Sequence, residues 1–203
     1  MYDAHYLMQW ADGFREVTLP NGEIIRGTGD PVIYADMLRS VNEEAPKAVL
    51  LSLSGTLLVI LLAFRGKKSG FVALFTLLMG LSWLVGFLAL RQIKLNFLNF
   101  IALPISIGIG ADYALNVLKR REVAGDANLR RVVVETGGAV IVCSLTTTLG
   151  YLALLFSING AVRSFGLAAA AGELTTLLAG VLFLPAALFW WSNRQRDAAQ
   201  RRS

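Results

Sequence analysis

The sequence predicts an all-α integral membrane bundle of five transmembrane helices, preceded by a short α+β extramembrane segment. Two features of composition support this: 55% of the 203 residues are hydrophobic and only 16% are charged, whereas a soluble domain has about a quarter of its residues charged. The third observation is a set of five long apolar runs. About 20 helical residues cross a hydrocarbon core of roughly 30 Å, and each run is long enough to do so.

Residues 1–46 differ from the rest because they contain most of the acidic side chains. Residues 2–17 have the spacing of an amphipathic helix, residues 23–27 read as a short strand, and residues 32–44 predict a second helix that leads into the membrane. Elements of this size are too small to form a core on their own. We therefore expect this segment to be the end of a larger extramembrane domain whose earlier part is absent.

The membrane module is predicted over residues 47–191, and residues 192–203 form a basic tail. The expected spans are residues 48–64, 71–90, 95–118, 136–157 and 165–191. An odd number of spans places the two ends of the chain on opposite sides of the membrane.

Basic residues beside the spans predict the orientation, because Lys and Arg accumulate in cytoplasmic loops. They are more frequent on the side that contains the tail: Arg65, Lys67, Lys68, Lys119, Arg120, Arg121, Arg130, Arg131, Arg194, Arg196, Arg201 and Arg202. The C-terminus is therefore expected in the cytoplasm and the N-terminal segment outside. No signal peptide is visible to carry that segment across the membrane. We accordingly expect a fragment, or a separate half-protein, with at least one further span upstream.

Composition also excludes several functions. One Cys and one His exclude a disulfide framework and a zinc site built from these residues, so no metal is expected. No paired catalytic acids or nucleophile–base set is visible, and we expect no enzyme. The basic residues are divided among loops, which argues against nucleic acid as a partner.

Two acidic side chains lie inside the apolar runs, Asp112 and Glu173. A charged side chain at the bilayer centre costs about 2.5–3.5 kcal/mol on insertion scales, so such residues normally face a cavity or a partner and are functional by default. Burial favours the neutral acid over the carboxylate. A carboxyl that gains and loses a proton near neutral pH would suit a proton-transport step.

The surroundings of Asp112 favour this role. Gly108, Asp112 and Asn116 are spaced four apart and share one helix face, and the glycine would let another helix approach. Tyr113 adjoins the carboxyl and can donate a hydrogen bond or relay a proton. The alternative is a buried polar contact that only orders the bundle.

Other polar residues leave their roles open. Glu173 borders a ridge of small residues, Gly172, Thr176 and Gly180, and could act in a relay or only in an interhelical hydrogen bond. Thr147 and Thr148 could line a water path, although hydroxyls are also common between membrane helices.

The run from Asn96 through Pro104 and Gly108 to Asp112-Tyr113 and Asn116 resembles the Asp-Tyr helix of the resistance-nodulation-division (RND) superfamily, and is most similar to its MMPL branch. Residues 26–33 resemble the last strand of the second periplasmic porter domain of that family. Residues 164–186 resemble its final helix.

The resemblance implies the C-terminal part of an exporter of lipids or other hydrophobic molecules, driven by the proton-motive force, in the bacterial inner membrane. It implies that Asp112 carries the proton with Tyr113 as its partner, and that the proton gradient takes the place of a cofactor. The expected partners are the lipid bilayer, a lipid or hydrophobic substrate, the missing N-terminal half on the same or a separate chain, and a second copy of the chain. The alternative function is a non-transporting module of the sterol-sensing or assembly type, in which Asp112 is structural.

Overall fold

The structure is a computed structural model that describes residues 4–20, 22–27, 29–65, 67–93, 96, 98–125, 129–190 and 194. The chain divides into two compact units, Met1–Ala48 and Val49–Ser203. The helix α2, Asp30–Phe64, runs through the division. Nearly all of the predicted basic tail, apart from Arg194, lies outside the described residues.

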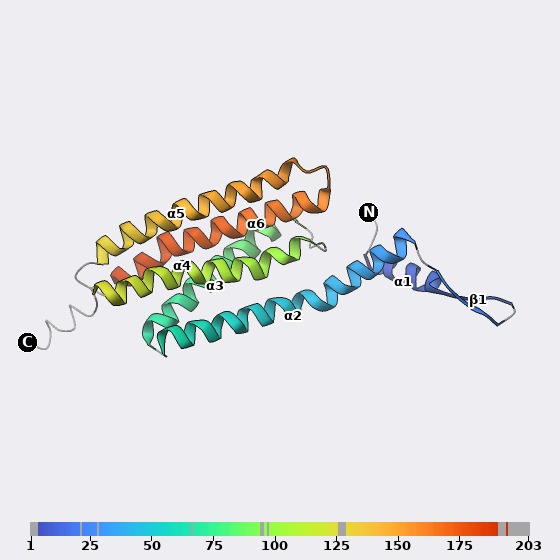
Figure 1. Ribbon diagram of the computed structural model, residues 1–203, viewed down its shortest axis with the longest axis horizontal. Coiled ribbons are helices and arrows are strands. Elements are labelled where there is room, and N and C mark those ends of the chain that lie inside the picture. Colours follow the sequence, from blue (N-terminus) through green and yellow to red (C-terminus); the bar gives the residue numbers. More distant parts are fainter. Residues whose placement is uncertain are drawn as a thin grey trace, which may run out of the picture. The chain divides into compact units, whose positions relative to one another are not determined.

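The first unit contains a short helix and a hairpin (Figure 1). Helix α1 spans Ala4–Arg15, and strands β1, Glu16–Thr18, and β2, Ile24–Arg26, pair antiparallel with Val17 opposite Ile25. The predicted helix over residues 2–17 therefore ends earlier, because its last residues pair with β2. Arg39 of α2 forms an ion pair of 2.6 Å with Asp12 of α1.

Helix α2 is continuous where the sequence predicts an extramembrane helix followed by a separate span. Pro46 lies inside it. Proline removes one backbone hydrogen bond and favours a kink, but the apolar run that follows continues the helix. One helix of 35 residues thus joins the polar segment to the membrane module.

The second unit contains the remaining membrane helices. They are α3, Lys68–Leu90; α4, Ala102–Ala124, preceded by the 3-10 turn η1, Asn99–Ile101; α5, Leu129–Ala153, followed by η3, Leu154–Phe156; and α6, Gly160–Leu178. A π-turn, η4, covers Ala179–Phe183, and helical structure resumes to Trp190. Five helices of the described chain are long and apolar enough to cross a membrane, which confirms the predicted bundle.

Three of these helices begin earlier than the apolar runs from which they were predicted. Helix α3 starts at Lys68, α5 at Leu129 and α6 at Gly160. Hydropathy detects only the part of a helix that is apolar, whereas polar turns can extend the same helix beyond it. The ion pair of 2.6 Å between Arg131 and Glu135, one turn apart, lies on such an extension of α5.

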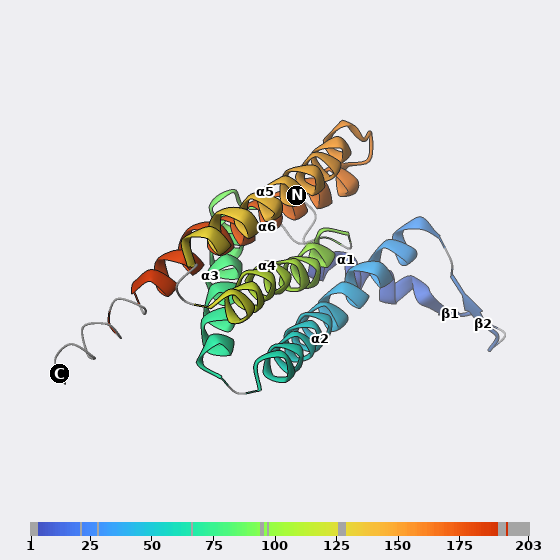
Figure 2. The same ribbon diagram turned by 60° about the vertical axis from the view of Figure 1, so that its left-hand side comes forward.

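Helix α6 is the central helix of the second unit and packs against α3, α4 and α5 (Figures 1 and 2). In the most apolar 18-residue stretch of this helical segment, 61% of the residues are buried inside the structure, against 11% in the corresponding stretch of α2. The predicted small-residue ridge forms the contact surface. A Cβ at Gly172 would overlap Ser106 of α4, and Thr176 fits against Gly80 of α3 and Gly110 of α4. Small side chains allow this close approach in membranes, where packing replaces the hydrophobic effect.

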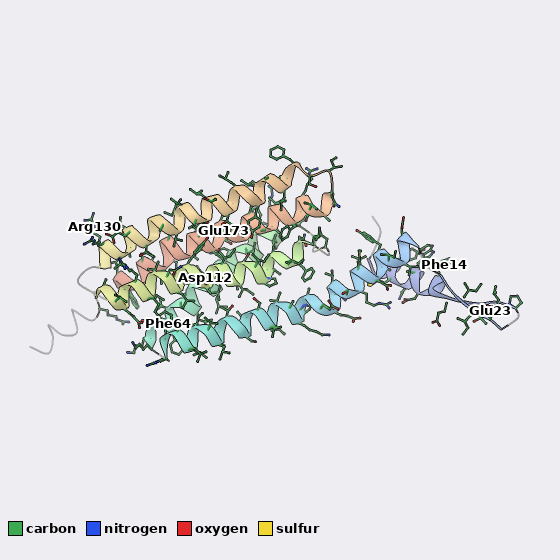
Figure 3. The ribbon with its side chains drawn as sticks, viewed as in Figure 1. Phe14, Glu23, Phe64, Asp112, Arg130 and Glu173 are labelled. Atoms are coloured by element: carbon green, nitrogen blue, oxygen red, sulfur yellow. The ribbon has the colours of Figure 1, made fainter. Side chains whose placement is uncertain are left out.

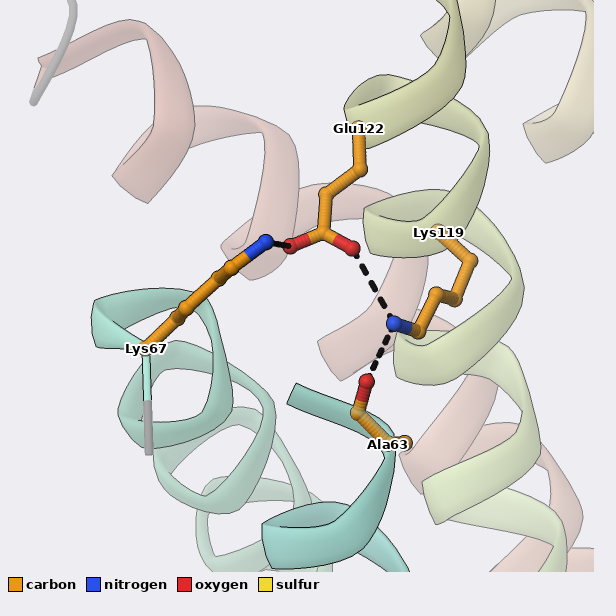
Figure 4. A network of polar contacts seen from close by, with 4 residues as sticks. All are labelled: Ala63, Lys67, Lys119 and Glu122. Carbon is orange, nitrogen blue, oxygen red and sulfur yellow. Dashed lines mark hydrogen bonds and ion pairs between the residues drawn. The ribbon is translucent and has the colours of Figure 1, made fainter. Parts of the chain in front are cut away.

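A polar network joins the end of α2 to α4 (Figure 4). The ammonium group of Lys119 donates hydrogen bonds to the Ala63 carbonyl and, over 3.0 Å, to Glu122. Lys67, in the connection between α2 and α3, reaches the other oxygen of Glu122 over 3.3 Å. A cation near the last carbonyls of a helix is favourable, so the network holds the end of α2 against the bundle.

Candidate proton site

Asp112, which Figure 3 labels on α4, lines a groove between α4 and α5. The volume of the groove is about 510 Å³. Its walls combine polar and apolar side chains: Ile109, Asp112, Tyr113, Asn116, Arg120, Thr136, Ala139, Val140, Cys143 and Thr147. Asp112 lies near the middle of α4, and among the described residues it has no hydrogen-bond or ion-pair partner. Its side chain is therefore exposed on the wall of the groove.

The face of α4 that carries Asp112 is open within the described chain. Gly108, Asp112 and Asn116 are all exposed, and a Cβ placed on Gly108 would meet no atom within 4 Å. The sequence predicts that a helix approaches this face through Gly108. No helix of the described chain does so.

Tyr113 points toward a different partner from the one expected. It is buried, and its hydroxyl donates a hydrogen bond to Oε1 of Glu173, sixty residues away on α6. Consecutive residues of a helix project about 100° apart. This separates the Asp112 carboxyl on the open face from the phenol of Tyr113, which enters the bundle.

Glu173 is one of the most deeply buried side chains, with 1% of its surface exposed. The sequence left open whether it acts in a relay or in an interhelical hydrogen bond. The structure shows the bond to Tyr113 and also leaves the second carboxyl oxygen, Oε2, without a hydrogen-bond partner. Buried polar atoms are normally satisfied, so this one requires a physical explanation.

The hydroxyls of α5 divide between the two regions. Thr147 lines the groove and donates to the Cys143 carbonyl over 3.1 Å. Thr148 is buried instead, and its hydroxyl has no hydrogen-bond partner. Ser144, one turn earlier on the same face, is also buried and unpartnered, and lies beside the phenol of Tyr113. Ser144 was not among the predicted site residues, although its spacing of four from Thr148 is a signal that could have identified it.

The described residues contain no group of three or more His, Cys, Asp or Glu side chains that could hold a metal ion. The site contains the carboxyl groups of Asp112 and Glu173 and the phenol of Tyr113, all within membrane-spanning segments. These groups bind, donate and release protons.

A family model matches nearly the whole chain. The model of the MMPL family aligns with residues 11–203. This chain belongs to the MMPL family. It is a multi-pass membrane protein, in agreement with the five helices of the described residues that are long and apolar enough to cross a membrane, and with the resemblance to the MMPL branch that its sequence indicates.

Two curated relatives are also described as membrane proteins. A protein of Methanocaldococcus jannaschii is 26% identical over 84% of this chain and 46% of its own length. A protein of Streptomyces coelicolor is 27% identical over 86% of this chain and 26% of its own length. The MMPL chain described here thus spans less than half the length of each of these relatives.

Proposed function

We propose that this chain is the C-terminal transmembrane module of an RND-type exporter driven by the proton-motive force, with Asp112 as its proton-binding residue and Tyr113 as the adjoining relay group. The single observation that carries this proposal is the position of Asp112. Its carboxyl is exposed on a groove at the middle of a membrane helix and has no partner among the described residues. An ionisable group is costly at that depth, and such groups mark ion pathways.

The open face of α4 indicates how the module would be completed. Gly108, Asp112 and Asn116 form a polar stripe that no described helix covers. We propose that the other half of the exporter, on the same or a separate chain, packs against this stripe and encloses Asp112. The relatives are longer than this chain, which is compatible with such a half.

An apolar pocket on the surface of the module supports the proposal that the transported molecule is hydrophobic. A pocket of about 390 Å³ between α3 and the end of α6 has almost entirely apolar walls, among them Phe71, Phe75, Phe183 and Trp190. Acyl chains fit such walls, whether they belong to bilayer lipid or to an exported lipid. We propose a lipid or other hydrophobic molecule as the cargo, the inner membrane as the location and no enzymatic activity.

The alternative, a sterol-sensing or assembly module, requires Asp112 to act structurally. A structural role would give Asp112 a hydrogen-bond partner inside the module, and none is present among the described residues. The alternative also predicts that replacing Asp112 lowers stability more than flux. The proposed function predicts the opposite.

The test is proton uptake by the complete exporter in proteoliposomes, with Asp112→Asn compared with the wild type. We expect the variant to insert normally and to lose proton-coupled transport. Glu135→Gln is the matched control, because it makes the same carboxyl-to-amide change in an exposed ion pair and should leave transport unchanged. Normal transport by Asp112→Asn would reject the assignment.

A further inference from the structure

Three buried side-chain oxygen atoms of α5 and α6 have no hydrogen-bond partner among the described residues. Oε2 of Glu173 and the hydroxyls of Ser144 and Thr148 are all buried and all lack a hydrogen-bond partner. They come from α6 and α5, and Tyr113 of α4 joins them through its hydrogen bond to Oε1 of Glu173. Buried oxygen atoms without partners are costly, so the unpartnered Oε2 of Glu173 requires a ligand or a proton that satisfies it.

The packing of α5 on α6 places Ser144 and Thr148 along the contact with α6. Near one end of the contact, Val140 packs in a buried cluster with Leu177, and near the other, the rings of Tyr151 and Phe165 are 6.1 Å apart. Ser144 and Thr148 lie between Val140 and Tyr151 on the same face of α5. They therefore lie opposite the middle of α6, which contains Glu173.

No cation of the described helices balances Glu173. The Lys and Arg residues of α3 to α6 lie at or near the helix ends; α3 has only Lys68, in its first turn, and Arg163 lies ten residues before Glu173. The ionisable groups that face it from the packed helices are Tyr113 of α4 and Tyr151 of α5. Cys143 lies beside Tyr113, and Asp112 lines the same groove as Tyr113. None of these groups supplies a positive charge.

A proton on Glu173 accounts for all of these observations. It removes the negative charge from a region where an unpaired carboxylate is costly. The carboxylic acid then has an O–H donor at Oε2, and the hydroxyls of Ser144 and Thr148 can accept it. The same proton thus gives Oε2 a hydrogen-bond donor for which a hydroxyl of α5 is a possible acceptor.

Tyr113 connects this buried acid to the groove, since it lines the groove and also donates to Glu173. We propose that Glu173 is a second proton-binding site of the module, loaded and unloaded through the phenol of Tyr113. This inference rests on the proposed function, because it assumes that the groove beside Asp112 supplies protons. It goes further by assigning a proton to Glu173, whose role the sequence left open and the family resemblance does not assign.

The loading step is balanced as a proton relay. The Tyr113 hydroxyl gives its proton to Oε1 of the Glu173 carboxylate while it accepts one from a hydronium ion in the groove, which becomes water. The phenol ends neutral and the carboxylate becomes a carboxylic acid. Rotation of the terminal Glu torsion, which is broad and nearly two-fold, turns the proton toward α5. Unloading reverses these transfers.

The first test is infrared difference spectroscopy of the complete protein in lipid, with pH varied. We expect a carbonyl band of a buried protonated carboxylic acid that is lost in Glu173→Gln and retained in Asp112→Asn. Tyr113→Phe should shift this band, because it removes the hydrogen bond to Oε1. Tyr151→Phe is the matched control, since it also removes a phenol near Glu173 but not that bond. A spectrum unchanged in Glu173→Gln would overturn the proposal.

The second test separates a proton from a metal cation. Carboxylate and hydroxyl oxygens can also bind Na⁺, and loss of the Glu173 band on adding NaCl at constant pH would identify a cation site and overturn the proposal.

The third test measures the pH dependence of transport by the complete protein. Glu173→Gln should change its pH profile and Glu173→Asp should restore the profile in part, while thermal unfolding stays near the wild type. Failure of Asp112→Asn to block transport, with the Glu173 band intact, would reject the proposed function separately.

Discussion

Gly180 of α6 lies directly against Tyr113 of α4, and a Cβ placed on Gly180 would come within 3.2 Å of the Tyr113 Cβ. The glycine thus makes room for the tyrosine whose hydroxyl bonds Glu173. The contact between Gly180 and Tyr113 and the hydrogen bond between Tyr113 and Glu173 both depend on the close approach of α4 and α6. A larger side chain at position 180 would therefore change the position of the Tyr113 hydroxyl relative to Glu173.

Gly180→Ala is expected to displace Tyr113 and to destabilise the module. Overpacking of a tight contact costs about 1–3 kcal/mol. Gly86→Ala on α3 is the matched control, because a Cβ there meets no atom within 4 Å and Ala favours helix over Gly. Thermal unfolding in lipid or detergent should rank Gly180→Ala below the wild type and Gly86→Ala at or above it. Equal stability of the two variants would contradict the contact.

Gly108→Leu is expected to block transport by the complete exporter without unfolding this module. Nothing in the described chain lies within 4 Å of a Cβ at Gly108, so a larger side chain meets no obstacle here. It would, however, obstruct the half that we propose to cover the Asp112 face. Transport and thermal unfolding measured together check this expectation. Gly86→Leu, on an equally open position of α3, should leave both unchanged. Full transport by Gly108→Leu would show that no helix packs there.

Lys119→Ala is expected to lower stability by about 1 kcal/mol, the upper range for a cation at a helix C-terminus. Lys119 bonds the Ala63 carbonyl and Glu122, and its ammonium group lies 4.6 Å from the centre of the Phe64 ring. Lys67→Ala should cost less, because Lys67 is 65% exposed and makes a single longer contact with Glu122. Unfolding at low and high salt measures both effects. A larger loss in Lys67→Ala would contradict the network of Figure 4.

Asn99→Ala is expected to cost about 1–3 kcal/mol because it leaves buried partners unsatisfied. The Asn99 amide donates to Ser164 over 2.7 Å and accepts from the Asn96 backbone N–H over 2.7 Å. Ser164→Ala should cost less, since it removes only the first of these bonds. Unfolding of both single variants and the double variant gives the coupling energy. Additive losses would show that the contact between Asn99 and Ser164 contributes nothing.

The sequence predicts the presence of the membrane helices better than it predicts where helices and strands begin and end, and α2 is an example. Its sequence predicts a helix over residues 32–44 and a separate span over residues 48–64, whereas the structure has one helix that continues through Pro46. Local rules treat proline as a helix boundary, whereas an apolar segment in a membrane must satisfy its own backbone and so favours continued helix. The short strand β1 was missed for a related reason. A strand of three residues depends on its partner, and sequence spacing near α1 does not reveal that partner.

The sequence by itself determined the class of protein, the five spans, the positions of the two intramembrane acids and the MMPL resemblance, because hydropathy and spacing are local properties. Only the tertiary structure decided that Tyr113 bonds Glu173, that Asp112 and Tyr113 line one groove between α4 and α5, and that Ser144 lies beside the phenol of Tyr113. Helical periodicity shows which residues share a face. Which helix that face meets, and at what level, is set by close packing between segments far apart in the chain.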